Sequence, residues 1–128
     1  MSQSTTERNR AIVLAFVDLL YRQRQVRLAF ERYVIPGYVQ HNPNIADGRE
    51  AAIAALVPLF SSPEASFDVK RILVDDDLAA IHLHGRRSTA TPGGAVVDLF
   101  RLEDGQIVEH WDVLQPVPES AANPHPMF

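Results

Sequence analysis

The sequence predicts an α+β cone, in which N-terminal helices pack in the concavity of a strongly curved antiparallel or mixed sheet. Three observations indicate this class. Apolar residues recur at helical spacing before Ser66 and alternate with polar residues after it. Helices followed by strands are typical of an α+β domain. The last alternating run, Val96 to Gln115, carries Asp98, His110 and Asp112, so a curled sheet would enclose a polar pocket.

The size and composition fit one domain over residues 1–128. A chain of this length buries about two-thirds of its unfolded surface, and 46% hydrophobic and 22% charged residues are ordinary for a globular protein. The net charge is -4 and the 12 Lys and Arg residues form no dense cluster, so nucleic acid is not an expected partner. The chain has no cysteine, which excludes disulfides. We expect no membrane span and a cytoplasmic location, because the N-terminus is polar and no apolar run is long.

The first two helices are predicted by their apolar spacing. A helix is expected over residues 5–24, opened by the capping-box pair Ser4 and Glu7. Its apolar side consists of Ile12, Ala15, Phe16, Leu19 and Leu20. A second, shorter helix is expected from Val26 to Val34, where a Pro-Gly pair stops it.

A short extended segment and a third helix follow. Tyr38 to Pro43 reads as extended and is stopped by its proline. Asp47 and Glu50 form a second capping-box pair, so the third helix should run from there to Phe60. Pro58 lies inside that helix and should kink its last turn.

The strands come next. Strands are expected at residues 67–74 and 78–87, joined by a turn at 75–77, and a turn at 91–94 leads into the final hairpin. Residues 116–128 are proline-rich and should form an extended tail that docks on the body through its terminal apolar residues.

The register of the final hairpin decides which side chains share a face, because one residue of slip moves every side chain to the other side. A two-residue loop would separate Asp98 from His110 and Asp112. A three-residue loop, with Gly105 at a left-handed bulge position, pairs Asp98 with His110. We favour the three-residue loop, because it collects all three polar groups on one face. The opposite face would then hold Val97, Leu99, Ile107, Trp111 and Val113.

The three polar residues of the hairpin are the candidate catalytic groups. Two carboxylates beside an imidazole can hold one proton ready to donate and one site ready to accept. Asp112 is the best acid/base candidate, Asp98 its partner, and His110 either a third catalytic group or the residue that orients Asp98. The structural alternative is that Asp112 is a strand-end carboxylate satisfied by backbone N–H groups or by His110.

For four further polar residues, the sequence leaves open whether the side chain faces the pocket or the outside. His41 and Asn42 lie at a proline-stopped rim, where they line the pocket or simply satisfy a turn. His82 and His84 alternate with better core residues, which favours an outward face for both. His-x-His and His-x-Asp pairs also match the count of a metal site, but a His-x-His pair on a strand arises easily by chance. No metal is expected.

The apolar outer face of the hairpin would be exposed to water in a single chain. Trp111 lies on this face, away from the candidate catalytic groups, and is better suited to packing than to holding a cofactor. The sequence therefore predicts a homodimer formed through the outer sheet face, including Trp111.

Several stretches of the chain resemble one known family. They are Tyr38-Val39-Gln40-His41-Asn42-Pro43, Asp98-Leu99-Phe100-Arg101, residues 104–115 of the hairpin, and the ending from Asn123 to Met127-Phe128. They resemble SnoaL-like proteins of the nuclear-transport-factor-2-like superfamily, which share the α+β cone and are related to polyketide cyclases that close rings by aldol chemistry without a cofactor. The resemblance covers nearly the whole chain.

The resemblance implies roles for particular positions. Asp112 looks like the general acid/base of the cyclases. In ketosteroid isomerases of the same superfamily, the base position looks like Asn42, which cannot take a proton, and the donor tyrosine looks like Phe16. The hydrogen-bond-donating acid of those isomerases resembles Asp98. Epoxide hydrolases of the superfamily use an Asp-Arg-Asp relay, but Arg101 is expected on the other face.

Together these observations predict a cofactor-independent acid/base enzyme acting on a small carbonyl compound. Asp112 would move a proton next to the carbonyl, while protonated Asp98 with His110 or His41 would stabilise the enolate. The residues expected to bind substrate are His41, Asn42, His82, Phe16, Phe60, Phe100 and Leu114. The resemblance of Phe16 and His82 to pocket positions places both in this set. A non-catalytic ligand-binding or dimerisation module and epoxide-type water addition remain the alternatives.

Overall fold

The computed structural model of the chain describes residues 4–128 and shows helices followed by strands, except that one strand lies between the second and third helices. Residues 1–3, the start of the polar N-terminal stretch, lie outside the described part. The helices are α1 (Thr5–Val17), the π-helical turn η1 (Asp18–Arg22), α2 (Val26–Tyr33) and α3 (Arg49–Ser61). The strands are β1 (Val34–Gln40), β2 (Ser66–Asp75), β3 (Leu78–Arg86), β4 (Gly94–Glu103) and β5 (Gln106–Pro116).

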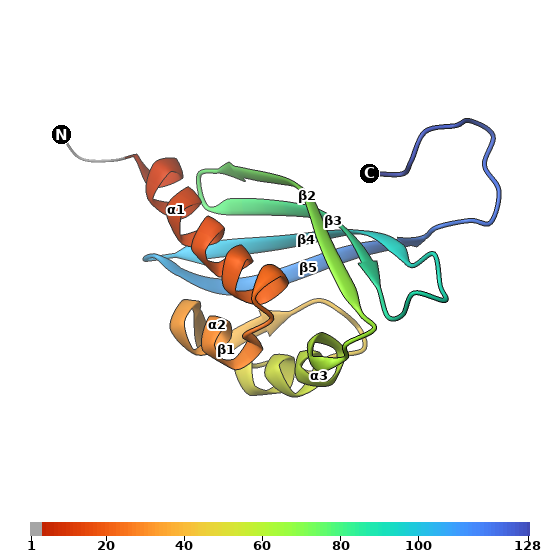
Figure 1. Cartoon of the computed structure of the whole chain (residues 1–128). Helices are drawn as coiled ribbons and strands as arrows, with labels where there is room; N and C mark the ends of the chain where they lie inside the picture. Colours follow the sequence, from red (N-terminus) through yellow and green to blue (C-terminus); the bar gives the residue numbers. More distant parts are fainter. Residues whose placement is uncertain (1–3) are drawn as a thin grey trace.

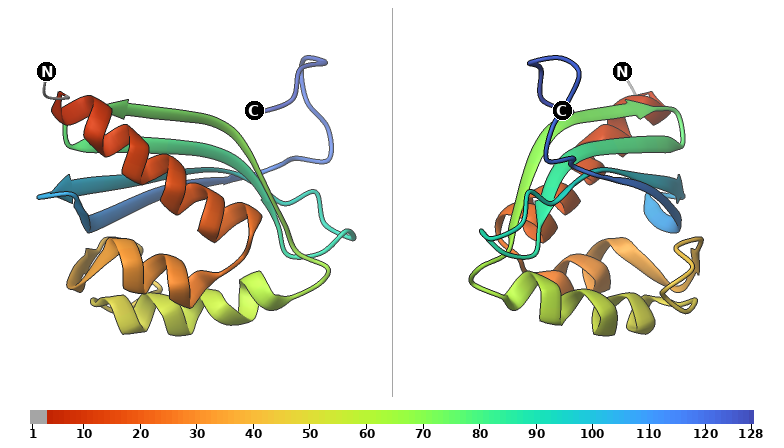
Figure 2. Two further views of the ribbon diagram at one scale, coloured as in Figure 1. Left: turned by 60° about the vertical axis from the view of Figure 1, so that its left-hand side comes forward. Right: turned by 90° about the vertical axis from the view of Figure 1, so that its right-hand side faces the viewer.

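The strands form one mixed sheet in the order β1-β5-β4-β3-β2. β1 runs parallel to β5, and the other neighbours are antiparallel. The sheet curves, and α1 crosses its concave side while α2 and α3 lie beneath it (Figures 1 and 2). This arrangement confirms the predicted α+β cone. Among the described residues, no helix combines the length and hydropathy needed to cross a membrane.

The core lies between the helices and the concave face of the sheet. Alternating residues of β3 and β4 point inward, such as Ile81 and Phe100, and meet the buried side of the helices. Phe16 is fully buried between Phe30 and Phe100, with ring centroids 5.6 and 5.3 Å away. These edge-on aromatic contacts fix where the first helix crosses the sheet.

The hairpin register differs from the prediction. The turn is the two-residue form, with Asp104 and Gly105 both at positive φ (51° and 76°), and Glu103 pairs with Gln106. The register then shifts between Arg101 and Leu102, because Val108 is an extra residue on β5.

This bulge decides the faces of β5. Beyond it, Phe100 pairs with His110 and Asp98 pairs with Asp112, so the three polar groups share the concave face after all. The predicted face was right, but the predicted pairing and the three-residue loop were wrong. Ile107, expected outside, is fully buried, because it precedes the bulge.

The helix ends also differ in part from expectation. Ser4 caps α1 as predicted, its Oγ accepting from the Glu7 N–H at 3.1 Å. The second capping box is not formed, because Gly48 is the N-cap of α3 and Asp47 instead accepts from the Gln40 N–H at 2.8 Å. The first helix ends in a π-helical turn rather than continuing as an α-helix.

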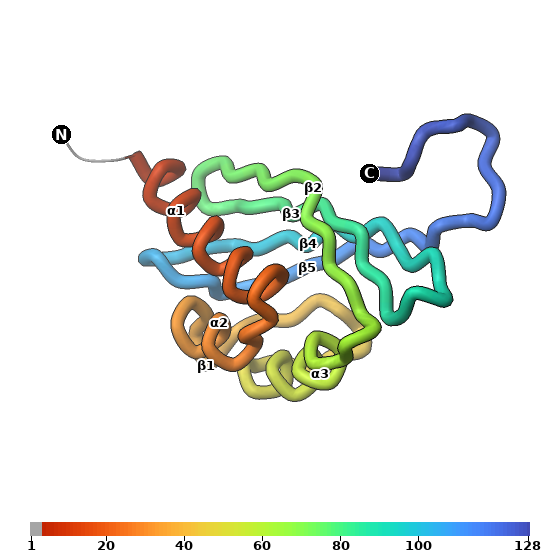
Figure 3. Tube along the Cα trace, viewed as in Figure 1, coloured from red at the N-terminus to blue at the C-terminus, as the bar shows by residue number. Residues whose placement is uncertain are grey.

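The tail after β5 loops back toward β2 and β3 (Figure 3). The Phe128 ring stacks on His84, with 4.2 Å between ring centroids, and Lys70 Nζ lies 5.6 Å from the Phe128 centroid. His84 Nε2 also donates to the Pro92 carbonyl at 2.7 Å. The tail is therefore linked through His84 to the loop between β3 and β4.

The turn of the hairpin gives the first testable prediction. Gly105→Ala should lower the free energy of unfolding by roughly 1–2 kcal/mol, because an L-residue is strained at positive φ. A Cβ at Gly105 would meet Ile12 Cδ1 at an ordinary 3.5 Å, so the cost is in the backbone rather than in a clash. Urea unfolding measures the difference. Asp104→Gly, at the other left-handed position, is the control and should not destabilise; equal losses in both variants would contradict this account.

Candidate functional site

A cavity of about 610 Å³ opens between the concave sheet face and the helices. Its walls are mostly apolar, and one region carries the polar residues of β1, β4 and β5. A cavity of this volume lies within the range of small-molecule sites. The apolar part of its lining includes Leu20, Phe30, Leu56, Leu59, Phe60, Phe67, Leu83, Val96, Phe100 and Leu114. The polar part includes Tyr21, Tyr38, Gln40, Asn42, Asp98, His110 and Asp112.

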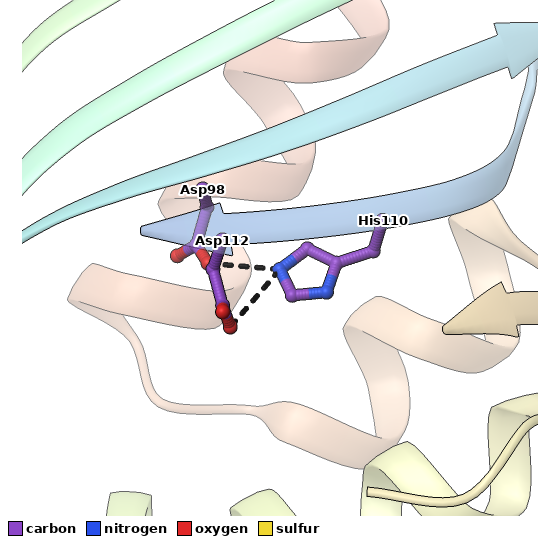
Figure 4. A group of neighbouring side chains, drawn as sticks. All are labelled: Asp98, His110 and Asp112. Carbon is purple, nitrogen blue, oxygen red and sulfur yellow. Dashed lines mark hydrogen bonds and ion pairs between the residues drawn. The ribbon is translucent and has the colours of Figure 1, made fainter. Parts of the chain in front are cut away.

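The polar region is centred on His110. Its Nε2 atom lies 2.9 Å from Asp98 Oδ1 and 3.8 Å from Asp112 Oδ2 (Figure 4). Asp98 comes from β4, and the other two residues from β5. The imidazole is buried and the two carboxylates are half-buried. The three predicted catalytic residues therefore lie together at the cavity wall.

The orientation of His110 follows from Gln40. The backbone N–H of Asn42 donates to Gln40 Oε1 at 3.0 Å, which identifies that atom as the amide oxygen. His110 Nδ1 lies 2.6 Å from the same oxygen and must therefore carry a hydrogen. Nε2 and Asp98 Oδ1 then share one proton: an imidazolium faces a carboxylate, or a neutral imidazole accepts from the carboxylic acid.

The second oxygen of Asp98 is also engaged. The Tyr21 hydroxyl donates to Asp98 Oδ2 at 2.5 Å. Burial raises the pKa of Tyr21 well above its usual value, and the neighbouring Asp98 carboxylate raises it further. Tyr21 therefore keeps its proton as a donor. Both oxygens of Asp98 are thus paired to protein groups, although the residue lines the cavity.

Asp112 is the carboxylate that faces the cavity with fewer partners. The Asn42 side-chain Nδ2 donates to its Oδ2 at 2.8 Å. The amide is oriented by its own oxygen, which accepts from the Asn44 N–H at 2.9 Å. His110 Nε2 is 3.8 Å away and supplies positive charge when protonated. Asp112 can therefore accept a proton from a ligand while Asn42 keeps it in place.

The same three residues could hold a cation. Asp98, His110 and Asp112 each offer one ligand atom, and these atoms lie within 4.8 Å of one another. The Nδ1–H bond to Gln40 is also the kind of outer contact that orients a metal-binding imidazole. A metal would have to replace the proton between Nε2 and Asp98. The observed hydrogen bond fits a proton relay directly.

Three residues expected to bind substrate lie outside the cavity lining. His41 stacks on Trp111 on the outer face, 4.9 Å between ring centroids, because β1 alternates and Gln40 and Asn42 take the inner positions. Phe16 is sealed in the core beneath Phe100.

His82 is the third of these. Its ring lies on the outer face, where Nδ1 accepts from Arg71 at 3.0 Å. The alternation of the strand predicted this outer position correctly, whereas the family resemblance had placed His82 in the pocket. Of the remaining predicted substrate contacts, Asn42, Phe60, Phe100 and Leu114 line the cavity.

Arg101 lies on the outer face, as the sequence predicts, directly opposite Glu109. Its Nε donates to Glu109 Oε1 at 2.9 Å. The two arginines of the cavity lining are Arg86, whose guanidinium donates to loop carbonyls, and the exposed Arg87. An Asp-Arg-Asp relay with Arg101 is therefore not formed.

Sequence reasoning missed Tyr21, Gln40 and Tyr38. The buried side of α1 is rotated by about one residue from the predicted side, so Val13 and Val17 are buried where Ile12 was expected. The four-residue spacing from Val17 marks Tyr21 as inward-facing, and this signal was available. The role of Gln40 depends on β1 lying parallel beside β5, where Gln40 pairs with His110.

Solved structures with the same fold define the class of the protein. A nuclear-transport-factor-2-like protein of unknown function from Mesorhizobium loti is 21% identical, with a TM-score of 0.76 over 90% of this chain and 97% of its own. A presumed ketosteroid isomerase from Kribbella flavida DSM 17836 is 18% identical (TM-score 0.75; 95% and 88% covered). A presumed SnoaL-like polyketide cyclase from Jannaschia sp. CCS1 is 23% identical (TM-score 0.65; 89% and 90% covered). The chain therefore has the nuclear-transport-factor-2-like cone.

Within this class the chain belongs to the SnoaL-like domain family, whose sequence model matches residues 13–110. The match confirms the resemblance found in the sequence. The sequence matches no curated protein at a significant level. Family and fold are thus established, and the chemistry has to be argued from the site itself.

The ion pairs of the outer face give the second prediction. A hydrogen bond from His41 (2.7 Å) and a second from Arg101 lower the pKa of Glu109 below its usual 4.5. A lowered folded-state pKa stabilises the fold above pH 4.5, and this contribution is lost as the pH falls through the folded-state value. Glu109→Gln should therefore destabilise the protein at pH 7 by less than about 1 kcal/mol, and the difference should vanish in acid.

Urea unfolding of both proteins between neutral and acidic pH measures this dependence. Glu103→Gln is the control, because it removes a more exposed carboxylate from the same arginine. A Glu109→Gln effect that stays constant with pH would contradict the assignment.

Proposed function

We propose that this protein is a cofactor-independent acid/base enzyme that moves a proton at the carbon next to a carbonyl in a small, largely apolar substrate. One observation carries the proposal. Asp112 faces an apolar cavity with a single hydrogen-bond donor from the described residues, Asn42, beside an imidazole that shares a proton with Asp98. A carboxylate in that position can take a proton and give it back.

The roles of the three groups differ. Asp112 is the base that removes the proton from carbon. His110 lies 3.8 Å from it and, when protonated, stabilises its ionised form before the transfer. Asp98 and Gln40 hold the two ring nitrogens of His110, so they position the imidazole rather than touch the substrate. Structures with this fold include a presumed polyketide cyclase and a presumed ketosteroid isomerase, and removal of a proton next to a carbonyl is a first step that suits both ring closure and isomerisation.

A non-catalytic binding module is the second candidate. The apolar lining and the volume of the cavity would suit a bound ligand equally well. The hydrogen-bonded carboxylate and imidazole pairs favour the enzyme, since a binding site has no need of a proton shared between two side chains. Epoxide-type water addition is less favoured, because Arg101 faces the opposite side of the sheet.

Replacing the base tests the proposal. Asp112→Asn should slow hydrogen–deuterium exchange beside the carbonyl of alicyclic and aromatic ketones by about 100- to 10,000-fold, because the amide cannot accept the proton. Proton NMR in D₂O measures the exchange, with chelator present so that any bound metal is removed.

Asp68→Asn, on the exposed side of β2, is the control and should keep full activity. Full activity in Asp112→Asn would rule out this mechanism. A wild-type protein that binds ketones tightly without exchanging their protons, and whose pocket carboxylates titrate as a model peptide does, would favour the binding module.

We also propose that the outer sheet face forms a homodimer. Leu73, Ala80, Leu99 and Trp111 form a continuous row of cross-strand neighbours across β2 to β5. Leu73 is 67% exposed in the single chain, and Val113 beside this row is 63% exposed. Burial of this apolar face against a second copy would remove it from water.

Val113→Asp should weaken such a dimer on the order of 100-fold or more, because it buries an unpaired charge in the interface. Light scattering coupled to gel filtration, over a series of protein concentrations, measures the association. Leu28→Asp on α2, which is also an exposed apolar position, is the control and should leave the association unchanged. A wild-type monomer at every concentration would end this proposal.

A further inference from the structure

The proposed proton transfer leaves a negative charge on the substrate oxygen, and a hydrogen-bond donor must face that oxygen. Most polar groups beside Asp112 are already engaged. Both oxygens of Asp98 are paired with Tyr21 and His110. The Asn42 side-chain N–H points at Asp112, and the Gln40 oxygen accepts from His110. Two donors remain at this wall: the Gln40 side-chain Nε2, on a half-buried residue, and the hydroxyl of a buried tyrosine.

Tyr38 is the buried residue of this wall with an unpaired donor. Its side chain is 2% exposed and lines the cavity. Within residues 4–128 its hydroxyl has no hydrogen-bond partner. The hydroxyl oxygen also keeps some accessible surface. Among the described residues, Arg49 Nε is the only side-chain polar atom that is both fully buried and unpaired, so the unpaired Tyr38 hydroxyl is not fully buried. A buried phenol with an unpaired hydroxyl at a cavity wall points to a ligand atom that accepts from it.

The Tyr38 ring is held in place. It lies roughly parallel to the His110 ring, with 6.1 Å between centroids, and meets the edge of Phe30 at 5.9 Å. The Tyr38 carbonyl accepts from the Gly48 N–H at 2.8 Å, which ties the strand to the start of α3. The hydroxyl is therefore preorganised, and a ligand oxygen would not have to order it.

Tyr38 also keeps its proton. Burial raises its pKa well above the usual value, and the negative charges of Asp98 and Asp112 raise it further. Both carboxylates thus act on the Tyr38 oxygen through space. A neutral phenol close to the base is the donor that a developing enolate needs.

We propose that the Tyr38 hydroxyl donates to the carbonyl oxygen of the substrate and stabilises the enolate oxygen formed when Asp112 removes the proton. This assignment rests on the proposed function. It also narrows the substrate to a neutral carbonyl compound whose oxygen and acidic carbon both enter the polar region while an apolar body fills the rest of the cavity. The balance is simple: one proton leaves carbon for Asp112, the carbon–hydrogen electron pair becomes the enolate, and the total charge of the site is unchanged.

A stable phenolate can replace the enolate in a test that needs no turnover. In the Asp112→Asn background, where the base is neutral as it is after proton transfer, Tyr38→Phe should weaken binding of 4-nitrophenolate about 10- to 100-fold. The same substitution should change the affinity for 4-nitroanisole by less than about twofold, because the methylated oxygen of this ligand carries no charge. Absorbance titration and calorimetry at a pH where the phenol is ionised measure both constants.

Tyr33→Phe is the matched control, because it removes a tyrosine hydroxyl that lies outside the cavity lining, and it should leave both affinities unchanged. Retention of 4-nitrophenolate affinity within twofold in Tyr38→Phe would overturn the assignment. So would an equal loss of both ligands, which would mean that Tyr38 only shapes the wall. Failure of the wild-type protein to exchange ketone protons would overturn the proposed function, but it would leave the phenolate result to decide the role of Tyr38.

Discussion

The site depends on one extra residue in β5. Leu102 and Ile107 pair inside the core next to the turn, so a regular ladder would continue by pointing Glu109 and Trp111 inward. The bulge at Val108 changes the phase of the strand by one residue. Beyond it, His110 and Asp112 point into the cavity and the charged and aromatic partners of His41 point out. A bulge of this kind re-aims side chains beside a functional site.

The bulge also explains why two kinds of chemistry lie on one sheet. On the concave side, the polar groups form a chain from Tyr21 through Asp98 to His110 and Gln40. Each of these hydrogen bonds is sheltered from water, so it fixes positions more firmly than an exposed one would. On the convex side, the stacked rings and the ion pairs of Arg101 are partly open to solvent.

Asp112 and Tyr38 stand apart from this chain. Neither is saturated by protein partners, and both face the cavity. A network that holds its own members tightly and leaves an acceptor and a buried donor free is suited to a ligand that offers a proton and an oxygen. The Asp112 carboxylate and the Tyr38 hydroxyl are thus available to a ligand, and the neighbouring residues hold these two groups in place.

The chain order of helices and strands and the concave location of the three catalytic candidates could be predicted from the sequence, because the 3.6 and 2.0 periods of apolar residues are local properties. The pairing of Asp98 could not be predicted, since nothing local distinguishes a bulge at Val108 from one at Gly105.

The sequence by itself determined the helices, the strands and the alternation that gives the sheet an inner and an outer face. Only the tertiary structure decided which further residues join the three predicted groups in the site. Gln40 reaches His110 because β1 lies parallel to β5, and Tyr21 reaches Asp98 because α1 crosses the concave face. His41 is turned outward by the same alternation that turns Asn42 inward. Local periodicity fixes which way a side chain points, whereas its partner depends on chain segments separated by as many as 77 residues in sequence.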